Sequence, residues 1–174
     1  MKNSFREQVR ARRGCAVILA GSGSDRPWVE KIAAALEEYG IPREVRICSA
    51  HKTPELLMRL IAEYNQLEGP LTFVAVAGGT DALSGVLGFH ALNPVISCPP
   101  GPVDAGGHNQ SCLDNPPGSA NAYIARPRNV AKFIAQLYAP FNPAYRKALI
   151  ERGQAKISEL AAEDARWRPE EGGV

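Results

Sequence analysis

The sequence has no long apolar run. No window approaches the roughly twenty apolar residues that a membrane-spanning helix needs. The basic beginning, MKNSFREQVRARRG, lacks the apolar stretch of a secretory signal peptide. We therefore expect a cytoplasmic protein with no membrane partner.

Charge of one sign and cysteine are also scarce. The net charge of +2 is too small to favour nucleic acid or a membrane surface as a partner. Four cysteines are widely spaced over 174 residues, which argues against a disulfide framework and against paired metal ligands. We expect no metal site, and small molecules or copies of the same chain as partners.

Apolar runs of strand length alternate with segments of helical period. This alternation predicts a three-layer, doubly wound (flavodoxin-like) α/β domain with a five-stranded parallel sheet and a C-terminal helical extension. Thr53 is the expected N-cap of the second helix, with Pro54 at its first position. The expected strands are 15–20, 43–49, 71–77, 94–98 and 122–125, and the expected helices begin near Pro27, at Pro54 and at residues 81, 128 and 144.

The chain divides into four expected parts. Residues 1–14 are predicted to be a flexible arm, and residues 15–139 the nucleotide-binding domain. Residues 140–167 should form a helix that packs on a neighbouring subunit, since no sheet face is left for it to cover; the alternative is a helix folded back on its own core. Residues 168–174 should be disordered.

Each of the first three strands ends in a polar or glycine-rich loop: GSGSD, SAHK and GGTDALSG. In doubly wound sheets ligands bind beyond the carboxyl ends of the strands, so these loops form the candidate site. Gly21 and Gly23 permit a tight turn, the hydroxyls of Ser22 and Ser24 can donate to a phosphate, and Asp25 suits ribose hydroxyls. The alternative for this first loop is an ordinary strand-to-helix turn.

The second loop carries two groups suited to chemistry. Lys52 can pair with a phosphate as a point charge, and His51 can take or give a proton near neutral pH. A lone histidine is more often a structural hydrogen-bonding group, and this interpretation is stronger for His90, within a helix, and His108, in a glycine-rich loop.

These loops, in this order, carry a family resemblance. The stretch AGSGSDRPWVEKIAAALEEYGIPREVRICSAHKTPELL, followed by FVAVAGGTDALSGVLGFHALNPVISCPP, resembles the phosphoribosylaminoimidazole carboxylases of purine biosynthesis from about Cys15 to Tyr138. The family contains direct carboxylases, which use carbon dioxide, and mutases, which rearrange N5-carboxyaminoimidazole ribonucleotide. SAHK, PVISCPP and the C-terminal extension are similar to the direct carboxylase branch, whereas the TP after Lys52 is mutase-like.

The resemblance implies a role for each position. His51 would be the proton shuttle at the ring carbon that gains the carboxylate; Ser22, Lys52 and Thr80 would hold the phosphate, and Asp25 the ribose. No metal, biotin, ATP or other cofactor is required, and the family forms homo-octamers whose neighbouring subunits complete each site. The full set of expected substrate-binding residues is Gly21, Ser22, Ser24, Asp25, Ser49, Ala50, Lys52, Gly78, Gly79, Thr80, Asp81, Ala82 and Leu83.

The third loop departs from the family pattern. Where the carboxylase branch reads GRSNGLGP, this chain reads GGTDALSG, so that an arginine becomes Gly79, an asparagine Asp81 and a glycine Ala82. The loop at 101–112 also lacks the family's central aromatic residue. Two hypotheses follow: a working carboxylase with a diverged third loop, or a paralogue that binds or acts on another phosphoribosyl compound.

Overall fold

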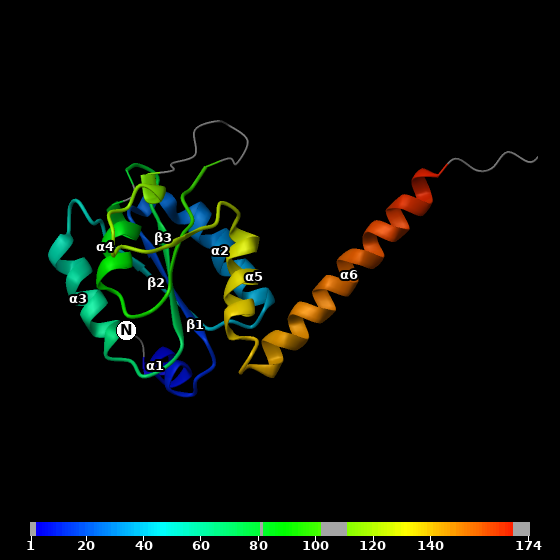
Figure 1. Cartoon of the computed structure of the whole chain (residues 1–174), viewed down its shortest axis with the longest axis horizontal. Coiled ribbons are helices and arrows are strands. Elements are labelled where there is room, and N and C mark those ends of the chain that lie inside the picture. The colour runs from blue at the N-terminus through cyan, green and yellow to red at the C-terminus, as the bar shows by residue number, and fades with distance from the viewer. Residues whose placement is uncertain (1–2, 81, 102–110, 169–174) are drawn as a thin grey trace, which may run out of the picture.

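The computed structural model describes residues 3–80, 82–101 and 111–168, and its centre is a parallel β-sheet (Figure 1). Five strands lie in the order β2-β1-β3-β4-β5, and every neighbouring pair is parallel. The strands are β1 (Cys15–Ala20), β2 (Arg43–Ile47), β3 (Leu71–Val76), β4 (Val95–Ser97) and β5 (Ala122–Tyr123).

The described residues also form six α-helices and two short 3₁₀ turns. They are α1 (Asn3–Arg10), η1 (Gly23–Asp25), α2 (Arg26–Glu38), α3 (Pro54–Asn65), α4 (Ala82–His90), η2 (Ser111–Leu113), α5 (Pro127–Tyr138) and α6 (Pro143–Trp167). The predicted doubly wound, flavodoxin-like fold is confirmed, with β2, β3, β4 and β5 each one or two residues shorter than expected.

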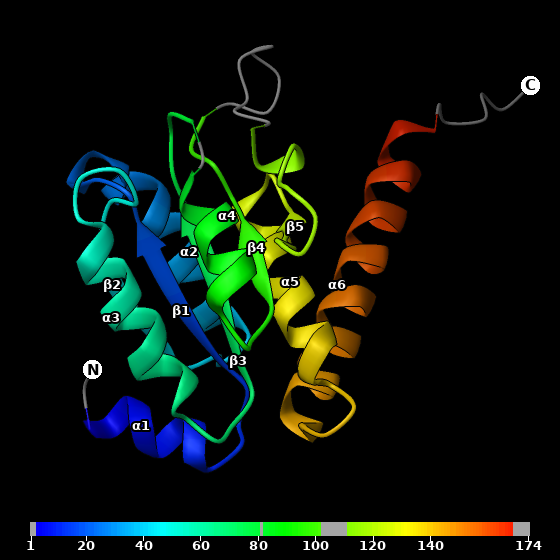
Figure 2. The same ribbon diagram turned by 60° about the vertical axis from the view of Figure 1, so that its left-hand side comes forward.

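The core lies on both faces of the sheet because β1 and β3 are apolar throughout. Both strands are buried at every position, as expected for strands covered by helices on both sides. Helices α2 and α5 pack on the face that carries Ile18 and Val74, and α3 and α4 pack on the face that carries Val17 and Phe73 (Figure 2). The result is three layers.

The strand order reverses at β1, which pairs with β2 on one side and with β3 on the other. The chain therefore turns in opposite directions after β1 and after β3, and a crevice forms where their carboxyl ends meet. The amide of Gly21, just past β1, donates to the Val76 carbonyl at 2.8 Å, which ties the first loop to the third strand.

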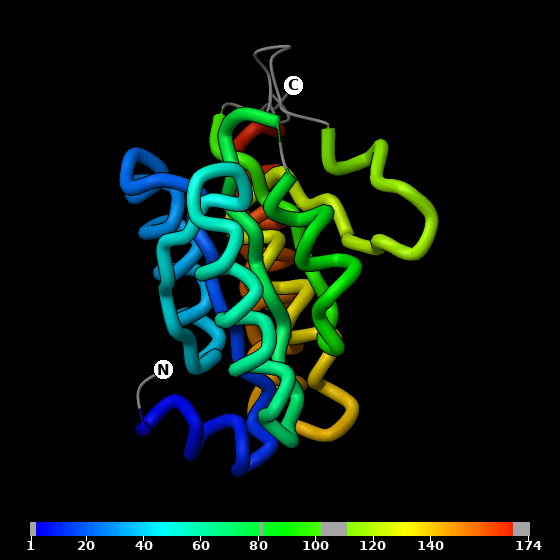
Figure 3. The backbone as a smooth tube through the Cα atoms, turned by 90° about the vertical axis from the view of Figure 1, so that its left-hand side faces the viewer, coloured from blue at the N-terminus to red at the C-terminus, as the bar shows by residue number. Residues whose placement is uncertain are grey.

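The expectation of a flexible arm over residues 1–14 is wrong for residues 3–10, which form α1 (Figure 3). Phe5 and Val9 are four residues apart, so they lie on one side of the helix, and both are buried against the α3 face of the sheet. A Cβ on Gly69 would lie 2.2 Å from the Val9 carbonyl oxygen, so that glycine is what permits the close approach. Arg6 pairs with Glu63 of α3 at 3.2 Å.

The start of helix α6 is tied to the domain, and the rest of the helix is not. Asn142 caps the helix by accepting from the Ala144 amide, and Tyr145 is buried and donates to the Gly14 carbonyl at 2.8 Å. Arg152 pairs with Glu38 at 2.8 Å. Beyond Gly153 every described residue is exposed, and α6 extends away from the sheet (Figure 1). The helical extension is confirmed; its packing on a neighbouring subunit stays a prediction.

All four cysteines are free and buried in the described structure. Burial raises the pKa of the Cys15 and Cys98 thiols to about 12, which keeps them protonated and unreactive. Among the described helices, none has the length and apolar character needed to span a membrane.

Candidate functional site

The three predicted loops line one cavity of about 370 Å³ beyond the carboxyl ends of β1, β2 and β3. Of the predicted residues, Ala50, Ala82 and Leu83 are not in its wall, and Asp81 lies outside the described residues. Ala77, which the sequence did not single out, is in the wall. The lining residues are Gly21, Ser22, Ser24, Asp25, Ser49, His51, Lys52, Ala77, Gly78, Gly79 and Thr80.

The first loop is organised by hydrogen bonds between its own residues. The Ser22 hydroxyl accepts from the Ser24 amide at 3.3 Å, while the Asp25 carboxylate accepts from the Ser22 amide at 3.0 Å, which makes a reciprocal capping box. The Ser22 and Ser24 hydroxyls also lie 2.9 Å apart. The loop therefore presents two hydroxyls at the start of α2, where the positive end of the helix favours an anion.

Asp25, like Glu44, is a buried carboxylate. Asp25 is 9% exposed. Burial raises the pKa of its carboxyl group, and the hydrogen bond from the Ser22 amide partly opposes this rise. One oxygen is engaged by that amide; the other faces Gly78 across the cavity, 3.8 Å from where a Cβ on that glycine would lie.

The second loop is a closed turn in which Thr53 does not act as predicted. The Thr53 hydroxyl makes no cap to α3; instead it accepts from the Ser49 amide at 3.0 Å and donates to the Ser49 carbonyl at 3.1 Å. The Lys52 amide donates to the Ser49 hydroxyl at 3.2 Å. The backbone groups of Ser49 and the amides of the first turn of α3 compete for the Thr53 hydroxyl, and the hydroxyl binds Ser49.

His51 and Lys52 project from this turn and are exposed. Within residues 3–80, 82–101 and 111–168, neither side chain has a hydrogen bond or an ion pair to another residue. Lys52 is the one lysine or arginine in the described wall, opposite a single carboxylate, Asp25. The cavity thus offers one cation, one titratable imidazole and several hydroxyls to a ligand.

The third loop begins with two glycines, which carry no side chain. A Cβ placed on Gly79 would meet none of the described residues within 4 Å, whereas a Cβ on Gly78 would lie 3.2 Å from the Pro100 side chain. Thr80 is exposed, and its carbonyl accepts from the Ala82 amide at 2.9 Å. Leu83 was expected to contact substrate, but it is 1% exposed and packs in the core. Its position near the loop could be inferred from sequence, whereas the direction of its side chain could not.

The remaining histidines do not join this cavity in the described structure. His90 lies at the end of α4, where its ring packs edge-on against Phe89 with 4.9 Å between the ring centroids, and His108 lies outside the described residues. The described part of the chain contains no cluster of three or more histidine, cysteine, aspartate or glutamate residues that could hold a metal ion.

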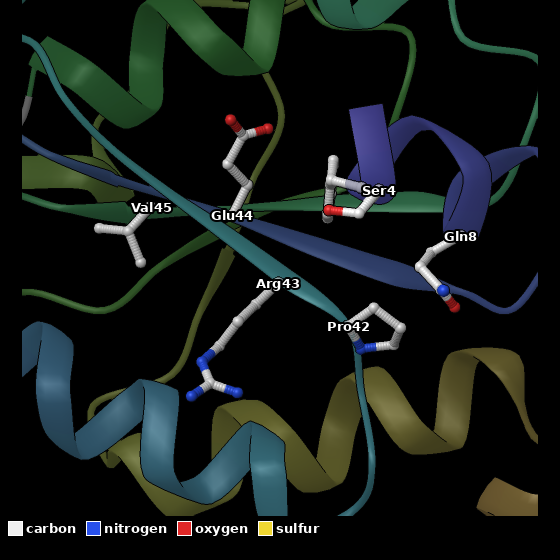
Figure 4. A pocket seen from close by; sticks show the side chains of 7 residues that line it. Ser4, Gln8, Pro42, Arg43, Glu44 and Val45 are labelled. Atoms are coloured by element: carbon white, nitrogen blue, oxygen red, sulfur yellow. The ribbon is translucent and has the colours of Figure 1, made fainter. Parts of the chain in front are cut away.

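A larger cavity, of about 610 Å³, lies between α1 and the edge strand β2 (Figure 4). Arg43 and Glu44 point to opposite sides of the strand, while Ser4 and Gln8 face it from α1. Arg43 is paired with Glu37 at 2.9 Å, and Glu44 accepts from the Tyr64 hydroxyl at 3.1 Å. Its charged groups already have partners, so the smaller cavity is the better candidate for chemistry.

Comparisons with known proteins identify the family of the chain. The sequence model of the family described as AIR carboxylase matches residues 15–159. The chain is similar to the phosphoribosylaminoimidazole carboxylases of Treponema denticola (32% identical; 90% of this chain and 99% of that one) and Archaeoglobus fulgidus (34%; 97% of both). The bifunctional phosphoribosylaminoimidazole carboxylase/phosphoribosylaminoimidazole succinocarboxamide synthetase of Rattus norvegicus is 42% identical over 70% of this chain and 29% of its own length.

The fold was also compared with solved structures, and one from Treponema denticola matches. The crystal structure of Treponema denticola PurE superposes with a TM-score of 0.85 at 30% sequence identity, covering 90% of this chain and all of that one.

Proposed function

The chain belongs to the AIR carboxylase family of enzymes, and we propose that its cavity binds aminoimidazole ribonucleotide and carboxylates it directly with carbon dioxide. The observation that carries the proposal is the convergence of His51, Lys52, Ser22 and Asp25 on one cavity. The choice of carbon dioxide over the mutase reaction rests on the sequence features SAHK and PVISCPP.

The phosphate end of the ligand is assigned to the hydroxyls and the ammonium group of this cavity. The Ser22 and Thr80 hydroxyls and the Lys52 ammonium would hold the phosphate, near the start of α2. Asp25 would accept hydrogen bonds from the ribose with the carboxylate oxygen that the Ser22 amide does not use. Its negative charge keeps it from serving the phosphate itself.

His51 would complete the reaction as the proton acceptor. The ring carbon of the aminoimidazole forms a bond to the carbon of carbon dioxide, which becomes a carboxylate. The same ring carbon then loses its proton to His51, and the electron pair of the broken C–H bond restores the aromatic ring. One positioned base of this kind contributes about 10²–10⁴-fold in rate. His51 suits the role because its side chain has no described protein partner and lines the cavity.

Two alternatives use the same cavity. The mutase would start from N5-carboxyaminoimidazole ribonucleotide, and a paralogue would bind another phosphoribosyl compound. The open space at Gly79 favours the paralogue, because the family pattern places an arginine there.

The test supplies the purified enzyme with aminoimidazole ribonucleotide and bicarbonate, or with N5-carboxyaminoimidazole ribonucleotide, and follows carboxylated product by ultraviolet absorption. We expect product from the first mixture and a loss of about 10²–10⁴-fold in kcat for His51→Asn. Product from the second substrate alone would identify the mutase. A thermal shift with aminoimidazole ribonucleotide but no product from either mixture would identify a binding paralogue.

We further propose that α6 packs on a neighbouring copy within a homo-octamer. Ile150, Ile157, Leu160 and Trp167 are exposed at spacings of seven, three and seven residues, the pattern of a helix that packs along one seam. An exposed helix of this length gains little stability without such packing. Light scattering should give a mass near eight chains, and Leu160→Asp should lower it; a monomeric wild type would contradict the assembly.

A further inference from the structure

The hydroxyl of Thr53 holds the turn that carries His51. It accepts from the Ser49 amide at 3.0 Å and donates to the Ser49 carbonyl at 3.1 Å, and the Thr53 amide donates to the same carbonyl at 2.9 Å. Both backbone groups of Ser49 are thereby joined to Thr53. The two ends of the turn are fixed relative to each other, with His51 midway between them.

The closed turn is in turn fixed to the fold on both sides. Before it, the buried Cys48 donates its amide to the Ala20 carbonyl of β1 at 2.9 Å. After it, the Leu57 amide donates to the Thr53 carbonyl at 3.1 Å, within the first turn of α3. Between these two anchors, the Thr53 hydroxyl joins the ends of the turn by its hydrogen bonds to the Ser49 amide and carbonyl.

His51 depends on this backbone for its position. Its side chain is exposed and has no hydrogen bond to another described residue, so no side chain in the described part of the chain orients it. Lys52 is in the same situation, apart from its amide, which donates to the Ser49 hydroxyl. A change in the turn would therefore move the proton acceptor and the phosphate-binding cation together.

Thr53 also occupies the N-cap position of α3 without capping it. A threonine there ordinarily accepts from an amide of the first helical turn and stabilises the helix. Here the hydroxyl serves Ser49 instead, so the helix forgoes that hydrogen bond.

We infer that Thr53 is a positioning residue for the reaction: its hydroxyl sets where His51 and Lys52 stand in the cavity. The inference deepens the proposed carboxylation and rests on it. Misplacement of a reacting group by about 1 Å can cost roughly a hundredfold in rate, so the loss of one hydroxyl at this point should be visible in kcat.

The test compares Thr53→Val with Thr53→Ser and with a matched substitution, Thr72→Val. Valine keeps the shape of threonine and removes the hydroxyl, and serine keeps the hydroxyl. Thr72 lies on β3, where its buried hydroxyl is 2.6 Å from that of Tyr138. We expect Thr53→Val to lose roughly ten- to a hundredfold in kcat, Thr53→Ser to recover most of the rate, and Thr72→Val to lower Tm without a comparable loss of kcat.

A second readout does not depend on activity. The ring signal of His51 in ¹⁵N-histidine NMR, assigned with His51→Asn, should shift or broaden in Thr53→Val and stay unchanged in Thr72→Val. Wild-type kcat in Thr53→Val, or an unchanged His51 signal, would overturn the inference. If the wild type forms no product, the proposed function fails on its own, and the NMR comparison still decides whether Thr53 positions His51.

Discussion

The loops after β2 and after β3 meet in one cavity, but they are held in opposite ways. The loop from Ser49 to Thr53 is closed by hydrogen bonds between its own residues, and it carries the imidazole and the ammonium. The loop after β3 has no side chain at Gly78 or Gly79, and no described residue comes within 4 Å of a Cβ placed on Gly79.

This difference separates two tasks of the site. A proton acceptor and a phosphate-binding cation must be placed accurately, and a closed turn does this at the cost of adaptability. The space beside Gly79 can accept ligand groups of different shape. Which ligand group lies there therefore depends on its size and charge more than on fixed contacts to the protein. We expect substitutions in the loop after β2 to affect rate and affinity for any ligand, and substitutions in the loop after β3 to change which ligand is preferred.

Removal of the Lys52 cation should have the largest effect of the three substitutions. Lys52→Met should weaken the binding of aminoimidazole ribonucleotide by about 10- to 150-fold, because a hydrogen bond to a charged group contributes about 1.5–3 kcal/mol. Isothermal titration calorimetry at two salt concentrations measures this effect, and the wild-type affinity should be the more salt-sensitive.

Lys132→Met is the matched control, since Lys132 is exposed on α5, away from the cavity. Equal affinities in wild type and Lys52→Met would contradict the assignment of Lys52 to the phosphate.

A cation added at Gly79, in the loop after β3, should have a smaller effect, and it tests whether this loop sets ligand preference. Gly79→Arg should fold normally, because no described residue lies within 4 Å of its Cβ position, and it should bind the carboxylated ribonucleotide more tightly relative to the uncarboxylated one. At about 4 Å in water the added attraction is about 1 kcal/mol, or about fivefold in Kd.

Two further variants separate the effect of the added charge from the effects of side-chain length and of the space available. Gly79→Gln adds similar length without charge and should leave the ratio of the two affinities unchanged. Gly78→Arg should lower Tm, because its Cβ would lie 3.2 Å from Pro100. A lower Tm in Gly79→Arg than in Gly78→Arg would show that the space beside Gly79 is not open in solution.

The contrast between the two loops also marks what the sequence could predict. Apolar strand runs such as CAVILA and LTFVAV locate the sheet, and the polar residues after them locate the cavity, because parallel strands end at one edge. Side-chain direction within the loops is decided by close competition between hydrogen-bond partners. Thr53 was therefore expected to cap α3 and instead binds Ser49. Helix α1 was missed because its buried side holds only Phe5 and Val9.

The smallest expected effect concerns Asp25, at the junction of the first and third loops. Burial raises the pKa of its carboxyl group above the unfolded value, so between these two pKa values the folded state binds more protons than the unfolded state. The free energy of unfolding therefore falls as pH rises through that interval, and the ionised carboxylate lowers stability at neutral pH.

Asp25→Asn removes this charge and keeps an oxygen that can accept from the Ser22 amide. We expect its Tm at pH 7 to equal or slightly exceed that of the wild type, and the difference to shrink as pH falls below the unfolded pKa of aspartate. Thermal denaturation from pH 3 to pH 8 measures this. A difference that does not change with pH would show that the charge is not the cause. Weaker binding of aminoimidazole ribonucleotide in the same variant would mean that the buried carboxylate lowers stability but serves the ligand.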